Sequence, residues 1–170
     1  MLVAAALLAA RVSAASDCVR AFELQGHRLG AAYTVDTDWC QQVSKSAKLW
    51  RCPHSIRSGE MIIETYSYVV DGALEGVELD FPSEYFEQVV VAYSDKLGCK
   101  PTLKDFPVQN GFGAKFTDSK AAWETPSGTF EIQRYGQGLK RSQGEIDSIK
   151  LGAALNKASS DSNKKLSGAL

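Results

Sequence analysis

The dipeptide Asp71-Gly72 lies between two runs of alternating apolar and polar residues, and it constrains the fold of this chain more than any other short stretch. Asp-Gly is typical of the two-residue type I′ turn, because both central residues of that turn take positive φ angles. The flanking runs, residues 60–70 and 73–81, are therefore predicted to pair as an antiparallel hairpin.

The two-residue loop also predicts which residues of the hairpin face each other, with Val70 opposite Ala73 and Tyr66 opposite Val77. In this register one face is apolar and is expected to meet the core: Ile62, Tyr66, Tyr68, Val77, Leu79 and Phe81. The other face carries Ile63 and four polar residues, Thr65, Ser67, Glu78 and Asp80. Because an antiparallel sheet can leave one face open to water, these four polar residues are the candidate binding face.

The strongest helix signal follows this hairpin and covers residues 83–97. Ser83 is the predicted N-cap, and the acidic Glu84 and Glu87 suit the positive end of the helix dipole. Apolar side chains then recur at spacings of three and four, at Phe86, Val89, Val90, Tyr93 and Leu97. Gly98 is expected to end the helix, and its apolar stripe to pack on the apolar face of the hairpin.

A second hairpin is predicted around Pro126-Ser127-Gly128, between residues 121–125 and 129–135. It brings three large side chains toward the core: Trp123, Phe130 and Ile132. The resulting fold class is α+β. We expect an antiparallel sheet of four or five strands with one main helix packed on one face, in the order hairpin-helix-hairpin.

Two segments of the second half carry weaker signals. Residues 103–113 contain Pro107, Asn110-Gly111 and Gly113, so we predict a loop there. Residues 145–151 are predicted to add an edge strand.

The two ends of the chain differ from its middle in composition. Residues 1–10 are Leu, Val and Ala rich, and Val12-Ser13-Ala14 resembles a signal-peptidase site, so residues 1–14 are predicted to be a signal peptide. No stretch of the sequence is long and apolar enough to cross a membrane, so no transmembrane anchor is expected. Residues 153–170 are rich in Ser, Lys, Asp and Asn, which predicts a disordered polar tail. Residues 18–152 remain as a single domain, expected to be periplasmic or secreted.

The chain has four cysteines, Cys18, Cys40, Cys52 and Cys99, all beyond the predicted cleavage site. An even number in an exported chain favours disulfides, and the absence of a C-x-x-C motif argues against zinc. Three pairings are possible. A continuous helix over residues 37–50 is one interpretation of that segment, and a disulfide between Cys40 and Cys52 is incompatible with such a helix, because about 18 Å would separate them.

Four short motifs together resemble a widespread group of small exported bacterial proteins of uncharacterised function. They are Phe22-x-Leu24-x-Gly26-x-x-Leu29-Gly30, Val70-Asp71-Gly72-Ala73-Leu74, Lys96-Leu97-Gly98-Cys99-Lys100-Pro101 and Trp123-Glu124-Thr125-Pro126-Ser127-Gly128. The resemblance covers residues 22–151. The Leu29-Gly30 turn and the plan of a helix on a sheet are also similar, more distantly, to beta-lactamase inhibitor proteins and to a small lipoprotein of outer-membrane assembly.

The resemblance implies a disulfide pairing. The group has a cysteine pair like Cys40 and Cys52 before the first hairpin, whereas Cys18 and Cys99 are additions in this chain. The resemblance therefore implies a Cys40–Cys52 disulfide, with the two additional cysteines joined to each other.

The sequence contains no recognisable catalytic or cofactor-binding motif, so no catalytic residue, cofactor or metal site is predicted. The two histidines, His27 and His54, are candidate bases for a small hydrolase, but neither lies in a nucleophile motif. Trp39, Trp50 and Trp123 are candidates for a sugar or peptide platform, although core packing explains such residues equally well. The net charge of −1 and the short basic runs argue against a nucleic-acid partner.

These observations favour a non-catalytic envelope or secreted protein that binds another protein or a cell-wall component. A small extracytoplasmic hydrolase and a secreted enzyme inhibitor are the alternatives. An enzyme predicts a pocket that brings together a histidine, an acid and a nucleophile, whereas a binding protein predicts a broad surface without such convergence.

Overall fold

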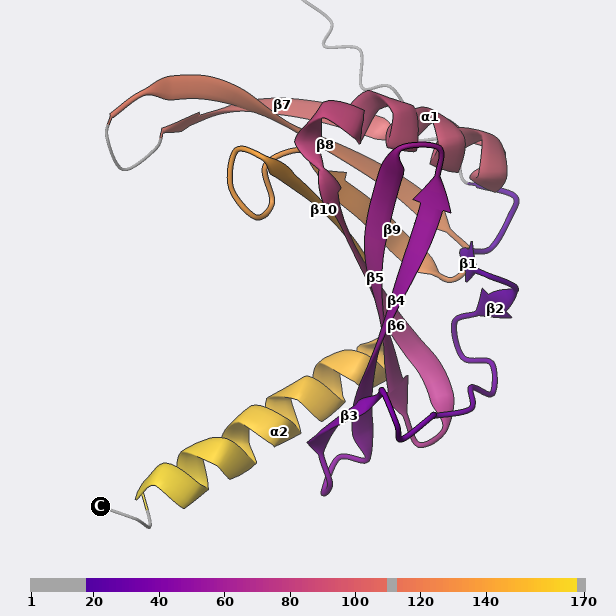
Figure 1. The fold of residues 1–170 in the computed structure, drawn as a ribbon, viewed down its shortest axis with the longest axis vertical. Helices are drawn as coiled ribbons and strands as arrows, with labels where there is room; N and C mark the ends of the chain where they lie inside the picture. Colours follow the sequence, from indigo (N-terminus) through magenta and orange to yellow (C-terminus); the bar gives the residue numbers. More distant parts are fainter. Residues whose placement is uncertain (1–17, 110–112, 168–170) are drawn as a thin grey trace, which may run out of the picture.

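The computed structural model describes residues 18–109 and 113–167, so the predicted signal peptide lies outside the described residues (Figure 1). The strands are β1 (Glu23–Leu24), β2 (His27–Arg28), β3 (Gln41–Ser44), β4 (Leu49–Ser58), β5 (Met61–Val70), β6 (Ala73–Pro82), β7 (Thr102–Gln109), β8 (Lys115–Thr125), β9 (Gly128–Gln133) and β10 (Arg141–Asp147). The helical elements are the 3-10 turn η1 (Ser83–Tyr85), α1 (Phe86–Leu97) and α2 (Ile149–Ser167).

Eight of the strands form one antiparallel sheet in the order β3-β4-β5-β6-β10-β9-β8-β7. An antiparallel sheet with one main helix packed on it is confirmed, but the prediction of four or five strands is too low. Residues 103–113 are not a loop along most of their length, because β7 pairs with β8 from Thr102 to Gln109. Pro107 is tolerated there because β7 is an edge strand, where a missing backbone N–H costs little.

The segment before β5 is a strand pair and not a helix. The chain turns over residues 45–48, with Lys48 at a positive φ of 47°, and β4 then pairs with β5 along its whole length. This pairing gives the backbone of β4 its hydrogen bonds, and it also permits the Cys40–Cys52 disulfide that a continuous helix would have prevented.

The first hairpin has the predicted turn but not the predicted register. Asp71 and Gly72 have positive φ angles of 54° and 77°, and Val70 lies opposite Ala73. A bulge at Glu75 then shifts the pairing by one residue, so that Thr65, instead of Glu64, faces Leu79. Because side chains alternate along a strand, this shift exchanges the two faces of β5 while those of β6 keep their predicted side.

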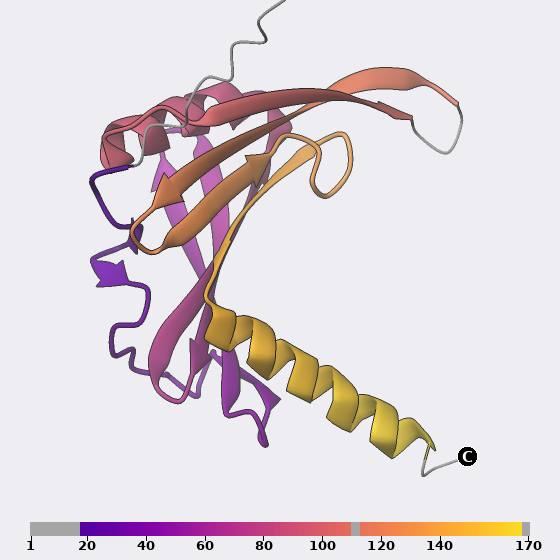
Figure 2. The same cartoon turned by 180° about the vertical axis from the view of Figure 1, so that it is seen from behind.

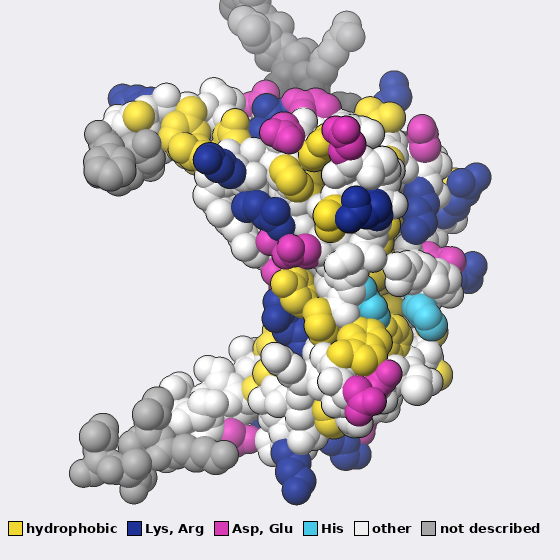
Figure 3. All heavy atoms as spheres, viewed as in Figure 1, with side chains coloured by type: hydrophobic (Ala, Val, Ile, Leu, Met, Phe, Trp, Pro, Cys, Tyr) yellow, Lys and Arg dark blue, Asp and Glu magenta, His cyan; other side chains and the backbone are white. Residues whose placement is uncertain are grey.

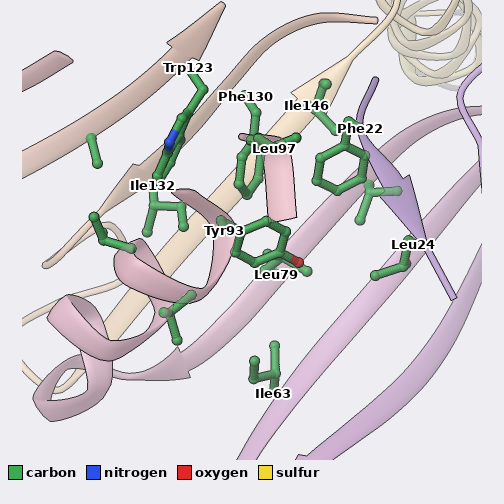
Figure 4. Close-up of a cluster of buried hydrophobic side chains, with 14 of the residues drawn as sticks. Phe22, Leu24, Ile63, Leu79, Tyr93, Leu97, Trp123, Phe130, Ile132 and Ile146 are labelled. Atoms are coloured by element: carbon green, nitrogen blue, oxygen red, sulfur yellow. The ribbon is translucent and has the colours of Figure 1, made fainter. Parts of the chain in front are cut away.

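The core lies between one face of the sheet and α1 (Figure 4). All five residues of the predicted apolar stripe of α1 are buried, and Gly98 ends the helix in the left-handed conformation, as predicted. Ser83 is not its N-cap: it lies in η1 and donates a hydrogen bond from Oγ to the carbonyl oxygen of Leu139, at 3.0 Å. The second hairpin forms as predicted and contributes the buried Trp123, Phe130 and Ile132.

The segment before β3 closes the same side of the core. Phe22 is fully buried, with its ring 4.8 Å from that of Phe130 and 6.0 Å from that of Tyr93. The two disulfides are Cys18–Cys99, which joins this segment to the end of α1, and Cys40–Cys52. This is the pairing that the resemblance implied. Two disulfides are the state expected of a protein outside the cytoplasm.

The predicted tail and the predicted edge strand at residues 145–151 both require correction. The strand is β10, which ends at Asp147, and residues 149–167 form α2 in place of a disordered tail (Figure 2). Ser148 begins this helix, since its Oγ accepts the backbone N–H of Leu151 at 3.1 Å and donates to Glu75 Oε2 at 2.7 Å. Leu151 and Ala154 are buried against Leu49 and Val70. Over the described residues, neither helix is long and apolar enough to cross a membrane.

Candidate functional site

The sheet has one covered face and one largely open face, and the open face is the candidate functional site. The covered face packs on α1 and on the segment that contains Phe22. On the open face, α2 covers only the end near Leu49 and Val70. Figure 3 shows that the molecule is hollowed on one side, between the β7–β8 hairpin and α2. We define the open face by the polar and aromatic side chains that alternate with the core residues of β5, β6, β8, β9 and β10: Glu64, Tyr66, Tyr68, Glu78, Asp80, Lys120, Glu131, Gln133, Arg141, Gln143, Glu145 and Asp147.

The structure separates the four residues of the predicted binding face. Glu78 and Asp80 lie on the open face as expected. The prediction is wrong for Thr65 and Ser67. Both lie on the covered face, where they are 0% and 1% exposed. The cause is the bulge at Glu75, which shifts β5 against β6 by one residue. Glu75 is itself buried, and its carboxylate binds Ser148 and Lys150, more than 70 residues away in sequence.

Three glutamates form a row across adjacent strands of the open face. Glu145 of β10 lies directly opposite Glu78 of β6 and, on its other side, directly opposite Glu131 of β9. Side chains in such positions have Cβ atoms about 5 Å apart, and like charges there destabilise a sheet. We call these three residues the glutamate row. Sequence analysis missed Glu131 and Glu145, because β10 inserts between β6 and β9 through pairings that no local pattern signals.

Of the three carboxylates in the glutamate row, only Glu131 forms an ion pair among the described residues. Lys120 Nζ lies 2.5 Å from Glu131 Oε2. Glu78 accepts hydrogen bonds from neutral groups, among them the Tyr68 hydroxyl at 2.8 Å and Gln143 Nε2 at 3.4 Å. Burial and the bond to Glu78 raise the pKa of Tyr68 to about 12, so its hydroxyl remains a donor at neutral pH. Among the described residues, no ion pair reaches Glu78 or Glu145.

Asp147 extends this acidic region toward α2. Burial, together with the negative charges of Glu145 and Glu78, raises the pKa of Asp147 to about 6. A surface hollow of about 380 Å³ lies beside it and is lined by Thr129, Glu131, Glu145 and Asp147. Three of the four side chains that line this hollow are carboxylates, so the hollow is acidic.

Farther along the open face, the carboxylates are paired. Arg141 lies between two of them, with Nε 2.7 Å from Asp80 Oδ1 and a terminal nitrogen 3.5 Å from Glu64 Oε2. The side chain of Glu64, which interrupted the predicted apolar face of the hairpin, therefore lies on the polar side of the sheet. The guanidinium carbon of Arg51 lies 3.4 Å from the ring centre of Tyr66. Among the described residues, no ion pair reaches Glu78, Glu145 or Asp147, although Arg51 binds the Tyr68 hydroxyl that donates to Glu78.

The two histidines come together in a different place. His54 Nε2 lies 2.7 Å from the Tyr33 hydroxyl, and the ring centre of His27 lies 5.0 Å from that of Tyr33. The ring of Trp39 meets His54 edge-on, at 4.7 Å. Burial and the neighbouring His27 lower the pKa of His54, which favours the neutral form of its ring. Figure 3 shows both histidines away from the concave side of the molecule, which lies between the β7–β8 hairpin and α2.

This histidine cluster packs the segment before β3 against β4. The group bound to His54 Nε2 is the phenol of Tyr33, in contact with the ring of His27. The three tryptophans do not meet: Trp39 joins the histidine cluster, Trp50 packs near the Cys40–Cys52 disulfide, and Trp123 lies in the core. No set of three metal-ligating side chains is grouped for a metal ion within residues 18–109 and 113–167.

Comparisons of this chain with protein-family models, with curated protein sequences and with solved structures found no significant match.

Proposed function

We propose that this protein is a non-catalytic periplasmic or secreted binding protein that holds another protein on the open face of its sheet. The observation that carries the proposal is the contrast between the two faces. One is closed by α1 and by the disulfide-linked segment before β3, and the other presents polar side chains at a hollowed surface (Figure 3). A polar sheet face with charged side chains is a surface that a partner of complementary charge recognises.

Two features favour binding over hydrolysis. The open face carries carboxylates, amides and tyrosines spread over several strands, which is a broad surface without a convergent acid, base and nucleophile. The histidines lie elsewhere and contact Tyr33 and Trp39. A secreted enzyme inhibitor would be one form of such a binding protein.

A position-specific photocrosslink tests this proposal. Thr129→Cys places a thiol at the edge of the acidic hollow, and Val91→Cys places one on the outer surface of α1, where Val91 is 59% exposed. Because all four native cysteines are in disulfides, a photoreactive maleimide labels the new thiol alone. We expect the Thr129→Cys protein to give a discrete adduct with the native extracytoplasmic fraction, competed by unlabelled protein. Equal adducts from both positions, or adducts without competition, would contradict the proposal.

A further inference from the structure

The segment between the two disulfides is attached covalently at both ends and loosely in between. One disulfide joins Cys18 to Cys99 at the end of α1, and the other joins Cys40 to Cys52 of β4. Within this segment, every residue from 25 to 39 is exposed or half-buried. We call residues 25–39 the strap. A stretch that buries so little surface is held to the rest of the protein by few contacts.

Two sets of contacts hold the strap on the sheet. Its backbone, at Gly30, Ala31 and Tyr33, forms hydrogen bonds with residues 72–74 at the turn between β5 and β6. Its side chains meet β4 mainly at His54, whose Nε2 lies 2.7 Å from the Tyr33 hydroxyl. The state of the His54 ring therefore affects how firmly the strap lies on β4.

Both histidines of the chain lie at this junction, one on each side of it. His27 belongs to the strap and His54 to β4. The ring of Tyr33 contacts both, with its centre 5.0 Å from that of His27 and 6.3 Å from that of His54. Histidine is the side chain whose charge ordinarily changes between about pH 5 and pH 8. The side chains that join the strap to β4 are thus grouped around two proton acceptors.

The charged groups of the strap and of β1 do not compensate a proton on this cluster. Among the described residues, no carboxylate forms an ion pair with either histidine. Glu23 of β1 is paired with Arg28, at 3.4 Å. The carboxylate of Asp36 accepts the backbone N–H of Asp38, at 3.0 Å.

The sheet offers His54 no counter-charge either. Its directly opposite residue on β5 is Thr65, which carries a neutral hydroxyl. Because side chains alternate along a strand, the nearest charged residues of β4 and β5 point to the other face of the sheet: Arg51, Arg57 and Glu64. A proton on His54 would therefore lie beside a second histidine without a carboxylate to balance it.

Protonation of His54 should consequently favour an open strap. Burial and the neighbouring His27 lower the pKa of His54 while the strap is closed. Protonation also reverses the bond to Tyr33, because a neutral Nε2 accepts the phenol hydrogen and an imidazolium can only donate. Once the strap has lifted, His54 lies in water and returns toward its ordinary pKa. The open state then binds more protons, so a fall in pH shifts the equilibrium toward it.

We propose that residues 25–39 are an acid-released strap, which lies on β4 while His27 and His54 are neutral and lifts from it when they are protonated, with both disulfides keeping its ends attached. Leu29 and Tyr33 of the strap pack against the core beside Ile56 of β4, so lifting uncovers apolar surface there. The inference concerns the covered side of the sheet and does not depend on the partner proposed for the open face.

Hydrogen exchange of the oxidised wild-type protein, measured by mass spectrometry at about pH 5.5 and about pH 7.5, tests the proposal. After correction for the intrinsic effect of pH on exchange, the opening constant of the strap should be severalfold larger at the lower pH. Its upper limit is about tenfold, for one histidine that takes up a proton only in the open state. Residues 121–133, in the second hairpin, are the internal control and should show no change.

Two variants assign the effect to the histidines. His54→Gln keeps a hydrogen-bond acceptor for Tyr33 but takes up no proton, so the strap should stay closed at the lower pH. His27→Glu places a carboxylate beside His54, which should raise the pKa of His54 and suppress the acid release. Arg57→Gln is the matched control for His27→Glu. It makes the same change in charge at an exposed position on the other face of β4, and its acid release should stay within about twofold of the wild type.

An NMR titration of the ring protons gives an independent readout. His27→Gln leaves His54 as the one histidine to observe, and its pKa should be higher than in the wild type. Equal exchange of the strap at both pH values, or an equal rise in the strap and in residues 121–133, would overturn the proposal. So would acid release that persists in His54→Gln. These wild-type comparisons decide even if a variant does not fold, and none of them bears on the Thr129→Cys test of the open face.

Discussion

The two faces of the sheet differ in the interactions that dominate them, although the same strands form both. On the covered face, Phe22, Tyr93, Trp123 and Phe130 pack into one aromatic cluster, so burial of apolar surface dominates its energetics (Figure 4). On the open face, three glutamates of neighbouring strands lie side by side at a cost in stability. The covered face therefore stabilises the fold, and the open face keeps an arrangement that stability alone does not favour.

Leu79 and Glu78 are adjacent in β6 and point to opposite faces, so they give the largest test of this comparison. Leu79 is fully buried, and Leu79→Asp places a charge without a partner in the core, which should cost more than about 4 kcal/mol and unfold the domain. Glu78→Gln should change the free energy of unfolding by less than about 1 kcal/mol. Urea unfolding of both variants is the measurement, and equal losses would show that the faces do not differ as described.

The disulfides should stabilise the covered side by amounts that follow the length of chain they close. Cys18–Cys99 closes 81 residues and Cys40–Cys52 closes 12. The loop-entropy relation gives about 4.5 kcal/mol for the first disulfide and about 2.8 kcal/mol for the second. Paired Cys→Ser variants, compared by chemical denaturation, should show this order. A larger loss from the Cys40–Cys52 pair would mean that native contacts, and not chain entropy, set the effect.

Gly76 should tolerate no side chain, because it lies where α2 meets the open face. A Cβ at this position would lie 2.2 Å from Leu151 Cδ2 and 2.7 Å from Asp147 Oδ1. Gly76→Ala should therefore destabilise the protein by about 1–3 kcal/mol. Gly152→Ala is the control, since nothing lies within 4 Å of its added Cβ and alanine favours a helix. Thermal melts should move in opposite directions for the two variants.

Thr65 provides a smaller test of the covered face. Its hydroxyl is buried and, among the described residues, has no hydrogen-bond partner. Thr65→Val replaces that hydroxyl with a methyl group of similar size, so it should stabilise the protein by about 1 kcal/mol, the lower end of the cost of an unsatisfied group. A loss of stability would place a hydrogen-bonding partner, such as a water molecule, at this hydroxyl.

Asp147 tests the open face through the pH dependence of stability. Its pKa is about 6 in the folded protein and about 3.9 in an unfolded chain. The folded state therefore binds more protons between these values, so the contribution of this carboxyl to stability falls as the pH rises from about 4 to about 6 and is then constant. Asp147→Asn should flatten that part of the profile. An unchanged profile would contradict the raised pKa.

The sequence by itself determined the local features of the fold, which depend only on residues close together in the chain. The stripe of α1 with its Gly98 end, the turn at Asp71-Gly72 and the second hairpin around residues 126–128 all formed as predicted. Each depends on backbone preferences and side-chain spacing within about fifteen residues, which the sequence displays directly.

Tertiary structure decided the register of β5 against β6 and which side chains lie on the open face. The bulge at Glu75 exchanges the faces of β5, and the carboxylate at this bulge binds Ser148 and Lys150. The glutamate row exists because β10 inserts between β6 and β9, and β7 is a strand because β8 lies beside it. These features depend on hydrogen bonds and charges between residues far apart in the chain, so the local pattern predicted the turn of the first hairpin without predicting which side of β5 would be buried.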